Sequence, residues 1–469
     1  MDLLKKILLL GSPLYFLITV AFFLVNDYSV SPCLPILPLV YAVVFALVYT
    51  YRKESFKSFS VSFIFAIWFL RIVLVPLIYV VSGYVSHIKV DASFEFLNNA
   101  ILLICYEFVC VGFLIILDKK IDLIAQKKVC LDSNCGYEIN KVIYGVIFVI
   151  LSVSVICVKF DQSVLAALST VFDKLFFDSS ANVERRREIL YLYDYASSRM
   201  IYSVFMQTIY YLQILIPACL LSLFASRKKY GGQKGLLLCF IVVVGSLAIT
   251  TDNNIDSVYI MIATGVVTLL AYWQITKRYI VPVGVSGIIL IFVFLVKKSE
   301  TDFSTEASFL SSISPTFCAY FSSLPNISAG FLISYEDKFN TFIGDIIAGV
   351  PYMMAFFKGF PKSVTLYNEI VHGYTGEVNQ IVPLIISGFH YLGVFAPLFT
   401  LLVYEIAFKM ELSLMKAKTI FNQVLFALIV VNLSTGPCIF GFSNTIKRLC
   451  LFLPLLVLAY VNEHVRLNK

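Results

Sequence analysis

The chain has 469 residues, of which 59% are apolar, 15% are aromatic and only 14% are charged, and its formal net charge at pH 7 is +7. Soluble domains are about half apolar and about a quarter charged. This composition excludes a soluble enzyme, an intrinsically disordered chain and a nucleic-acid-binding protein. The apolar residues also occur in runs long enough to cross a bilayer. The sequence therefore predicts an all-α polytopic membrane protein, with a single integral membrane domain over residues 1–469.

Hydropathy divides the chain into apolar segments of the length that crosses a membrane. A spanning helix needs about 17–25 mostly apolar residues, and by this criterion the sequence predicts about twelve spans. Two of them are irregular: Pro383, Gly388 and Gly393 interrupt one, and Lys447 and Arg448 lie within the last. The predicted spans cover residues 7–25, 33–50, 59–83, 96–117, 142–158, 201–224, 235–250, 257–275, 279–296, 381–408, 418–434 and 440–461.

The basic residues of the short loops predict the orientation of these spans. Lys and Arg are enriched in the cytoplasmic loops of membrane proteins. If the N-terminus with Lys5 and Lys6 is cytoplasmic, most of the 36 Lys and Arg residues fall on the inner side. An even number of spans then places both termini in the cytoplasm. The net positive charge is thus a signal of topology and does not indicate a nucleic-acid partner.

Two long loops, residues 159–200 and 297–380, lie on the predicted outer face. Long loops in compact proteins usually have a function. The first is basic and contains the run VERRREI, with Arg185, Arg186 and Arg187, followed by Arg199. Guanidinium groups bind phosphate oxygens through paired hydrogen bonds, so these residues predict a site for a lipid pyrophosphate. The alternative is a set of local ion pairs with the acids of the same loop, together with contacts to lipid headgroups.

The large outer loop, residues 297–380, ends in a concentration of polar residues. Its middle, TFIGDIIAGVPYMMAFFKGFPK, predicts a surface or re-entrant pair of helices that covers a cavity. Its end, TLYNEIVHGYTGEVNQIVPLI, carries His372 and Glu377 just before a predicted span. These two side chains are candidate general bases at membrane level. The alternative is an ordinary solvated turn.

Ionisable residues within spans are costly in the bilayer and often functional. Arg71 and Glu107 lie in the middle of consecutive predicted spans. We therefore expect them to form an ion pair, whose role is structural or functional. Lys447 and Arg448 lie in the outer half of the last span and are expected to face an outer cavity. No metal-ligand pattern and no nucleotide-binding loop is present in the sequence, so we expect no metal and no cofactor.

With this layout, the chain resembles the Wzy-type O-antigen and capsular polysaccharide repeat-unit polymerases. The similarity covers the whole chain and includes the stretches VERRREI, SLAITTDNNIDSVYIMI and GEVNQIVPLIISGFHYLGVFAPL. It implies a fold similar to the GT-C glycosyltransferases and a glycosyltransferase activity. Such enzymes extend a glycan on undecaprenyl pyrophosphate, without a metal. The partners implied are lipid-linked oligosaccharides, membrane lipid and a chain-length regulator protein.

The chemistry of that reaction assigns roles to the candidate residues. The pyrophosphate leaving group requires cationic donors, and the acceptor hydroxyl requires a general base. The expected pyrophosphate-binding residues are Arg185, Arg186, Arg187, Arg199, Lys447 and Arg448. The expected general base is Glu377 or His372.

Two other functions remain open from the sequence. A lipid-linked oligosaccharide flippase also has about twelve spans, but it would be expected to have short loops and two related halves. An O-antigen ligase uses the same chemistry with a lipid A core as acceptor, and would require a critical His in the large outer loop, where His372 is the candidate. The long outer loops and the scarcity of charge in the spans favour the enzymes.

Overall fold

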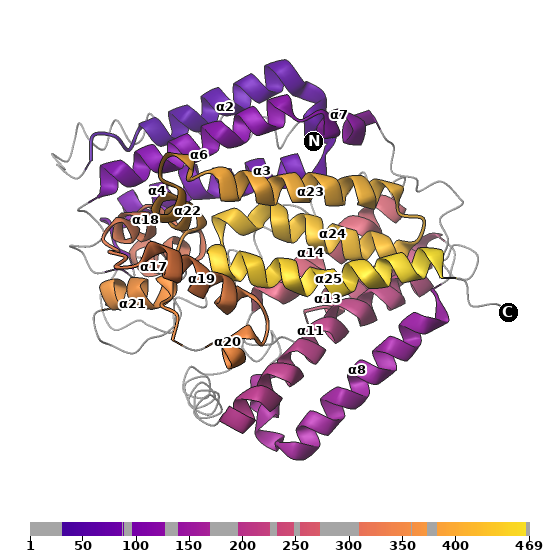
Figure 1. Cartoon of the computed structure of the whole chain (residues 1–469). Coiled ribbons are helices and arrows are strands. Elements are labelled where there is room, and N and C mark those ends of the chain that lie inside the picture. The colour runs from indigo at the N-terminus through magenta and orange to yellow at the C-terminus, as the bar shows by residue number, and fades with distance from the viewer. Residues whose placement is uncertain are drawn as a thin grey trace. The chain divides into compact units, whose positions relative to one another are not determined.

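In the structure, a computed structural model, all the regular elements among the described residues are helices, joined by turns and loops (Figure 1). This confirms the all-α prediction for that part of the chain. The described residues are 31–86, 88, 96–126, 139–168, 196–225, 232–247, 254–272, 309–357, 359–372 and 382–465.

Within these residues, seven helices are long and apolar enough to cross a membrane. At a rise of about 1.5 Å per residue, a helix of about 20 residues matches the thickness of the hydrocarbon layer. Each of the seven coincides with a predicted span, so the chain has the architecture of a polytopic membrane protein. They are Ile36–Lys57, Phe59–Val81, Leu97–Leu117, Lys141–Phe160, Met200–Phe224, Ile420–Cys438 and Phe442–His464.

The other five predicted spans do not correspond to a single long helix among the described residues. The segments 235–250 and 257–275 contain apolar helices that are shorter than a usual span. The segment 381–408, which the sequence marks as interrupted by Pro383, Gly388 and Gly393, is a bent pair of helices, Leu384–Phe395 and Leu398–Lys416, that meet at an angle of 108°. Gly393 has a positive φ of 59° at this bend, and Pro397 lacks the N–H group that would continue the helix. The segments 7–25 and 279–296 lie outside the described residues.

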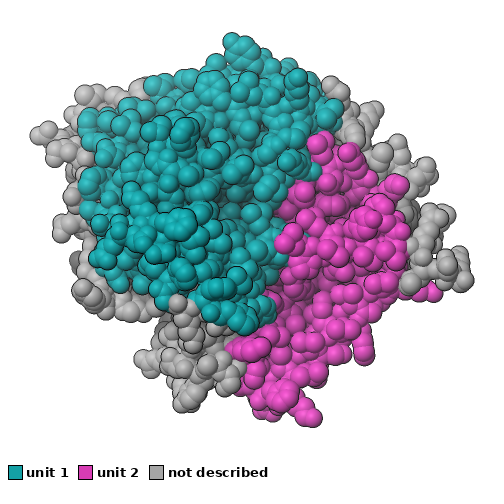
Figure 2. All heavy atoms as spheres, in the orientation of Figure 1, with its two compact units in different colours: residues 1–127, 298–409, 432–452 teal, residues 128–297, 410–431, 453–469 magenta. Residues whose placement is uncertain are grey.

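The chain divides into two compact units (Figure 2). Unit 1 comprises residues 1–127, 298–409 and 432–452, and unit 2 comprises residues 128–297, 410–431 and 453–469. Three helices have residues in both units: α23 (Leu398–Lys416), α24 (Ile420–Thr435) and α25 (Phe442–His464). The single membrane domain over residues 1–469 stays a prediction.

Unit 1 is built on the helices of the first described spans. They are α2 (Ile36–Arg52), η1 (Lys53–Lys57), α3 (Phe59–Phe69), the π-helical turn η2 (Leu70–Leu74), α4 (Val75–Val81), α6 (Leu97–Leu117) and α7 (Lys119–Gln126). Stacked aromatic side chains fill the space between them: the ring centroids of Tyr41 and Phe108 are 5.5 Å apart and those of Trp68 and Phe108 are 4.8 Å apart. Gly112 on α6 packs directly against Val44 of α2.

The large outer loop folds into short helices that belong to unit 1. They are α17 (Phe309–Tyr320), α18 (Leu324–Phe331), α19 (Lys338–Gly349), α20 (Met353–Phe356) and α21 (Ser363–His372), and they precede α22 (Leu384–Leu392) and η5 (Gly393–Phe395). Helix α17 packs on α4, and α18 packs on α6. Residues Leu324 to Gly330 of α18 are all buried. The loop is therefore part of the helical body of unit 1, which explains its apolar and aromatic composition.

Unit 2 centres on a long helix, α11 (Ala196–Phe224), which packs against α8 (Lys141–Phe160), α13 (Gly232–Gly245), α14 (Asn254–Ala271) and the short η3 (Gln162–Ala167). The Ser154 hydroxyl and the Thr208 hydroxyl form a buried hydrogen bond of 2.7 Å between α8 and α11. At the end of α25, the Asn462 amide donates to Thr419 Oγ1 and to Asn422 Oδ1, each at 3.0 Å. Polar side chains of this kind join helices in apolar surroundings, where an unmade hydrogen bond is costly.

Candidate functional site

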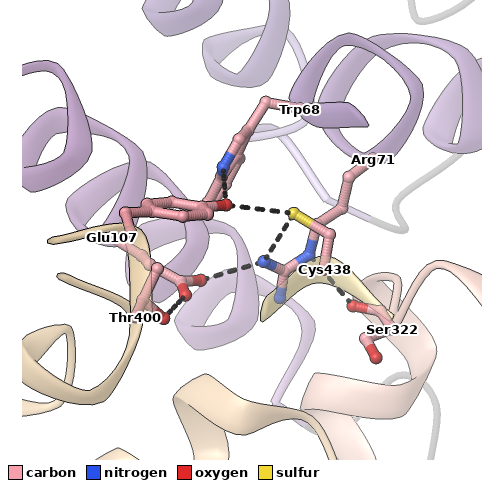
Figure 3. Close-up of polar contacts among 7 residues, drawn as sticks. Trp68, Arg71, Glu107, Ser322, Thr400 and Cys438 are labelled. Carbon is pink, nitrogen blue, oxygen red and sulfur yellow. Dashed lines mark hydrogen bonds and ion pairs between the residues drawn. The ribbon is translucent and has the colours of Figure 1, made fainter. Parts of the chain in front are cut away.

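Arg71 and Glu107 form a buried ion pair inside unit 1 (Figure 3). Arg71 lies on the π-helical turn η2 and Glu107 lies on α6. Arg71 Nη1 is 3.0 Å from Glu107 Oε2, and neither side chain is exposed to solvent. A buried charge is tolerated only when it is paired and hydrogen-bonded. The predicted pairing of these two residues is confirmed.

Further polar side chains complete the surroundings of this pair (Figure 3). Thr400 Oγ1 donates to Glu107 Oε1 at 2.5 Å. The Arg71 guanidinium lies 4.9 Å from the Trp68 ring, close to the Sγ atom of Cys438. These contacts join η2 and α6 to α23 and to η6 (Gly436–Cys438). Because the pair is fully enclosed, its role in this arrangement is to hold helices together.

The turn between α17 and α18 also reaches the ion pair. Arg71 Nε donates to the Ser322 carbonyl oxygen at 3.4 Å. Ser322 has a φ of 44°, a left-handed conformation that costs free energy in a residue with a side chain. The packing around Arg71 maintains this conformation. The large outer loop is thus connected through Ser322 to the interior of the helices that precede it in the chain.

A second polar cluster lies where α19, α21 and α22 meet. Its centre is Asp345, whose side chain is buried. Asp345 Oδ1 accepts a hydrogen bond of 3.0 Å from the Ser363 backbone amide, and Oδ2 accepts bonds of 2.5 Å from Ser363 Oγ and 2.7 Å from the Tyr391 hydroxyl. Burial raises the pKa of Asp345, while the hydrogen bonds from Ser363 and Tyr391 favour its carboxylate form.

Aromatic rings surround this second cluster. The Tyr335 ring stacks on Tyr391 with centroids 5.7 Å apart and meets the His390 ring edge-on at 4.6 Å. His390 Nε2 is 2.9 Å from the Gly330 carbonyl oxygen. The Phe442 ring of α25 stacks on Phe342 of α19 with centroids 5.5 Å apart. The cluster is therefore held rigidly by α19, α22 and the beginning of α25.

Helix α19 ends in direct contact with the first turns of α25. A Cβ atom on Gly349 would lie 2.6 Å from the Ser443 carbonyl oxygen and 2.7 Å from Ile446 Cβ. The next two residues of α25 are Lys447, which is exposed, and Arg448, which is buried. The Arg448 guanidinium lies 4.5 Å from the centroid of the Phe440 ring, a cation–π contact. The large outer loop thus packs beside the basic turn of the last candidate span.

Gly349→Ala tests this close approach. The added methyl group must push α19 away from α25, and forced overpacking of this kind costs about 1–3 kcal/mol. We expect a lower midpoint of thermal unfolding for the purified protein in detergent. Gly145→Ala is the matched control. Apart from the adjacent residues and the nearby backbone of its own helix, no atom lies within 4 Å of a Cβ placed at Gly145. Equal midpoints for the two variants would contradict the close contact.

Three of the residues predicted for the site lie on helices that border the same helix, α19. Lys447 and Arg448 lie on α25, and His372 is the last residue of α21; all three belong to unit 1, and both helices border α19. Arg199 lies on α11 in unit 2. The side chains of His372 and Arg199, and the whole of Arg185, Arg186, Arg187 and Glu377, lie outside the described residues, so their roles stay predictions.

Sequence reasoning missed Asp345, Ser363 and Tyr391. The signal for Asp345 was present: it is a single acidic residue in the apolar helix KFNTFIGDIIAG. Such a residue needs buried hydrogen-bond partners. Its partners Ser363 and Tyr391 are 18 and 46 residues away in the sequence, so nothing local identified them.

Among the described residues, no three His, Cys, Asp or Glu side chains are grouped so that they would hold a metal ion. Comparison with protein-family models found no family that matches the chain, and comparisons with curated proteins and with solved structures found no significant match.

Proposed function

We propose that this protein polymerises undecaprenyl-pyrophosphate-linked oligosaccharide repeat units into O-antigen or capsular polysaccharide. The proposal includes a GT-C-like fold of about twelve spans, a bacterial cytoplasmic membrane location and cytoplasmic termini. Lipid-linked oligosaccharides are its substrates, and a chain-length regulator protein is a further partner. The reaction takes place on the outer face of the membrane.

One observation carries this proposal: α19 of the large outer loop packs against the turn of α25 that bears Lys447 and Arg448. A lipid-linked substrate brings its pyrophosphate to the end of a membrane span. A binding site for this substrate therefore needs cationic groups at the end of the span and a folded loop that receives the sugar. Both features occur together in unit 1.

In the proposed reaction, the hydroxyl of the acceptor sugar attacks the anomeric carbon of the donor glycan. A new C–O bond forms as the bond between that carbon and the pyrophosphate oxygen breaks. The hydroxyl proton passes to the general base, for which His372 and Glu377 are the candidates. Arg448, Lys447 and the arginines of the basic outer loop (Arg185, Arg186, Arg187 and Arg199) stabilise the charge of the leaving pyrophosphate lipid.

Reconstitution of the purified protein with lipid-linked repeat units tests the proposal. We expect a ladder of products that differ by one repeat unit, formed without nucleotide sugars. The triple variant Arg185→Ala, Arg186→Ala, Arg187→Ala should abolish the ladder without loss of expression. Transfer only to a lipid A core acceptor would identify a ligase, and movement of single units across the bilayer without a ladder would identify a flippase.

A further inference from the structure

We infer that Asp345 is a positioning residue that holds helix α21 in place and thereby sets the location of His372. The catalytic part of this inference rests on the proposed function. Asp345 is 1% exposed, and both of its carboxylate oxygens accept hydrogen bonds from Ser363 and Tyr391, so we assign it no contact with a substrate. Its effect on a reaction must pass through the residues that it binds.

The first anchor is at the beginning of α21. This helix starts at Ser363, and the first backbone N–H groups of any helix lack partners within the helix. Asp345 accepts the Ser363 amide at 3.0 Å and the Ser363 hydroxyl at 2.5 Å. A carboxylate at this position also interacts favourably with the positive end of the helix dipole.

The backbone of α19 lies directly against the segment that leads into α21. A Cβ atom on Gly344 would lie 2.0 Å from the Pro361 carbonyl oxygen. Asp345 follows Gly344 in the sequence, so its short side chain reaches the first turn of α21. The Tyr391 hydroxyl donates to the same carboxylate at 2.7 Å and links it to α22.

The second anchor is in the middle of α21. Tyr367 is completely buried, and its hydroxyl donates to the Asn326 carbonyl oxygen of the buried helix α18 at 3.0 Å. His372 lies five residues further along, about 7.5 Å in helical rise. Two anchors on a short helix determine both its position and its direction. The backbone at the end of the helix is thereby held in one location, which matters for the proposed role of His372 because a misplacement of a catalytic group by about 1 Å can cost about 10²-fold in rate.

The experiment compares Asp345→Asn with the wild type by two measurements. The first is hydrogen–deuterium exchange of the α21 amides in the full-length protein in detergent. The second is the kcat and KM for elongation of lipid-linked repeat units in proteoliposomes, per amount of folded protein. Asp337→Asn is the matched control, because Asp337 is an exposed acid that caps α19 itself, with Oδ1 accepting the Asn340 amide at 3.0 Å.

For Asp345→Asn we expect exchange in α21 to rise by about tenfold or more. We also expect kcat to fall by about 10–10²-fold with KM changed by less than about twofold. Asp337→Asn should leave both unchanged. Tyr367→Phe removes the second anchor alone, and Ser363→Ala removes one bond of the first, so both should produce smaller changes in the same direction. These variants keep the test decisive if Asp345→Asn does not fold.

Unchanged exchange in α21 for Asp345→Asn, or for Ser363→Ala if Asp345→Asn does not fold, would overturn the holding role of Asp345. Increased exchange with normal kcat would overturn its connection to His372. A wild-type protein that forms no ladder would instead overturn the proposed function and the catalytic part of the inference. In that case the exchange measurement still decides whether Asp345 holds α21.

Discussion

Glu107→Gln is expected to lower the free energy of unfolding by about 3–5 kcal/mol. The substitution leaves the guanidinium of Arg71 without its counter-charge in a place with no access to water, because both side chains are completely buried. The free energy of unfolding is measured by adding dodecyl sulfate to the purified protein in mild detergent and monitoring the loss of helix by circular dichroism.

Two controls separate the loss of pairing from the loss of a side chain. Arg71→Met combined with Glu107→Leu removes both charges, and we expect it to recover most of the stability. Glu54→Ala removes one partner of the exposed Glu54–Lys57 pair, and we expect it to cost at most about 1 kcal/mol. If Glu107→Gln is no more destabilising than Glu54→Ala, the buried pair is not important for stability.

Arg448→Ala is expected to reduce elongation by about 10²–10³-fold, the usual effect of removing one preorganised donor to a developing negative charge. Arg448 is 6% exposed, so its charge acts in surroundings of low dielectric constant. Initial rates of ladder formation in proteoliposomes, normalised to folded protein, measure the loss.

Arg448→Lys keeps the charge but loses the planar fork that binds two phosphate oxygens together, so we expect a partial recovery of the rate. Lys409→Ala removes an exposed positive charge elsewhere in the same unit and should leave elongation unchanged. A normal rate for Arg448→Ala would remove this residue from the site, while a loss shared by Lys409→Ala would indicate a general effect of charge.

Hydropathy and the cost of buried charge predicted the features of the fold that are determined within one segment or between two adjacent segments. The seven long apolar helices coincide with predicted spans because the length of a span is a local property. The Arg71–Glu107 pair was predicted because each is an ionisable residue in the middle of neighbouring spans. Pro383, Gly388 and Gly393 marked the segment 381–408 as interrupted, but the sharp angle at the bend was harder to predict, since Gly and Pro are tolerated within many membrane helices.

The parts that sequence reasoning missed depend on contacts between distant segments. The pairing of Asp345 with Tyr391 requires α19 and α22 to pack together, and the turn at Ser322 finds its partner in a residue 251 positions earlier. The helix pair expected to cover a cavity was residues 341–362, whereas the burial of α18, earlier in the same loop, was not predicted. No local pattern distinguishes a covering helix from a buried one when both are apolar.

The order in which the chain is synthesised gives the Arg71 network a further consequence. Glu107 follows Arg71 by 36 residues, whereas Ser322, Thr400 and Cys438 follow much later. An unpaired arginine is costly during insertion into a bilayer. The early pair of helices therefore brings its own counter-charge into the membrane, before the rest of unit 1 exists. The later contacts then form around a pair whose charges already neutralise each other. The same two residues therefore serve first in membrane insertion and afterwards in the packing of the large outer loop and the last helices.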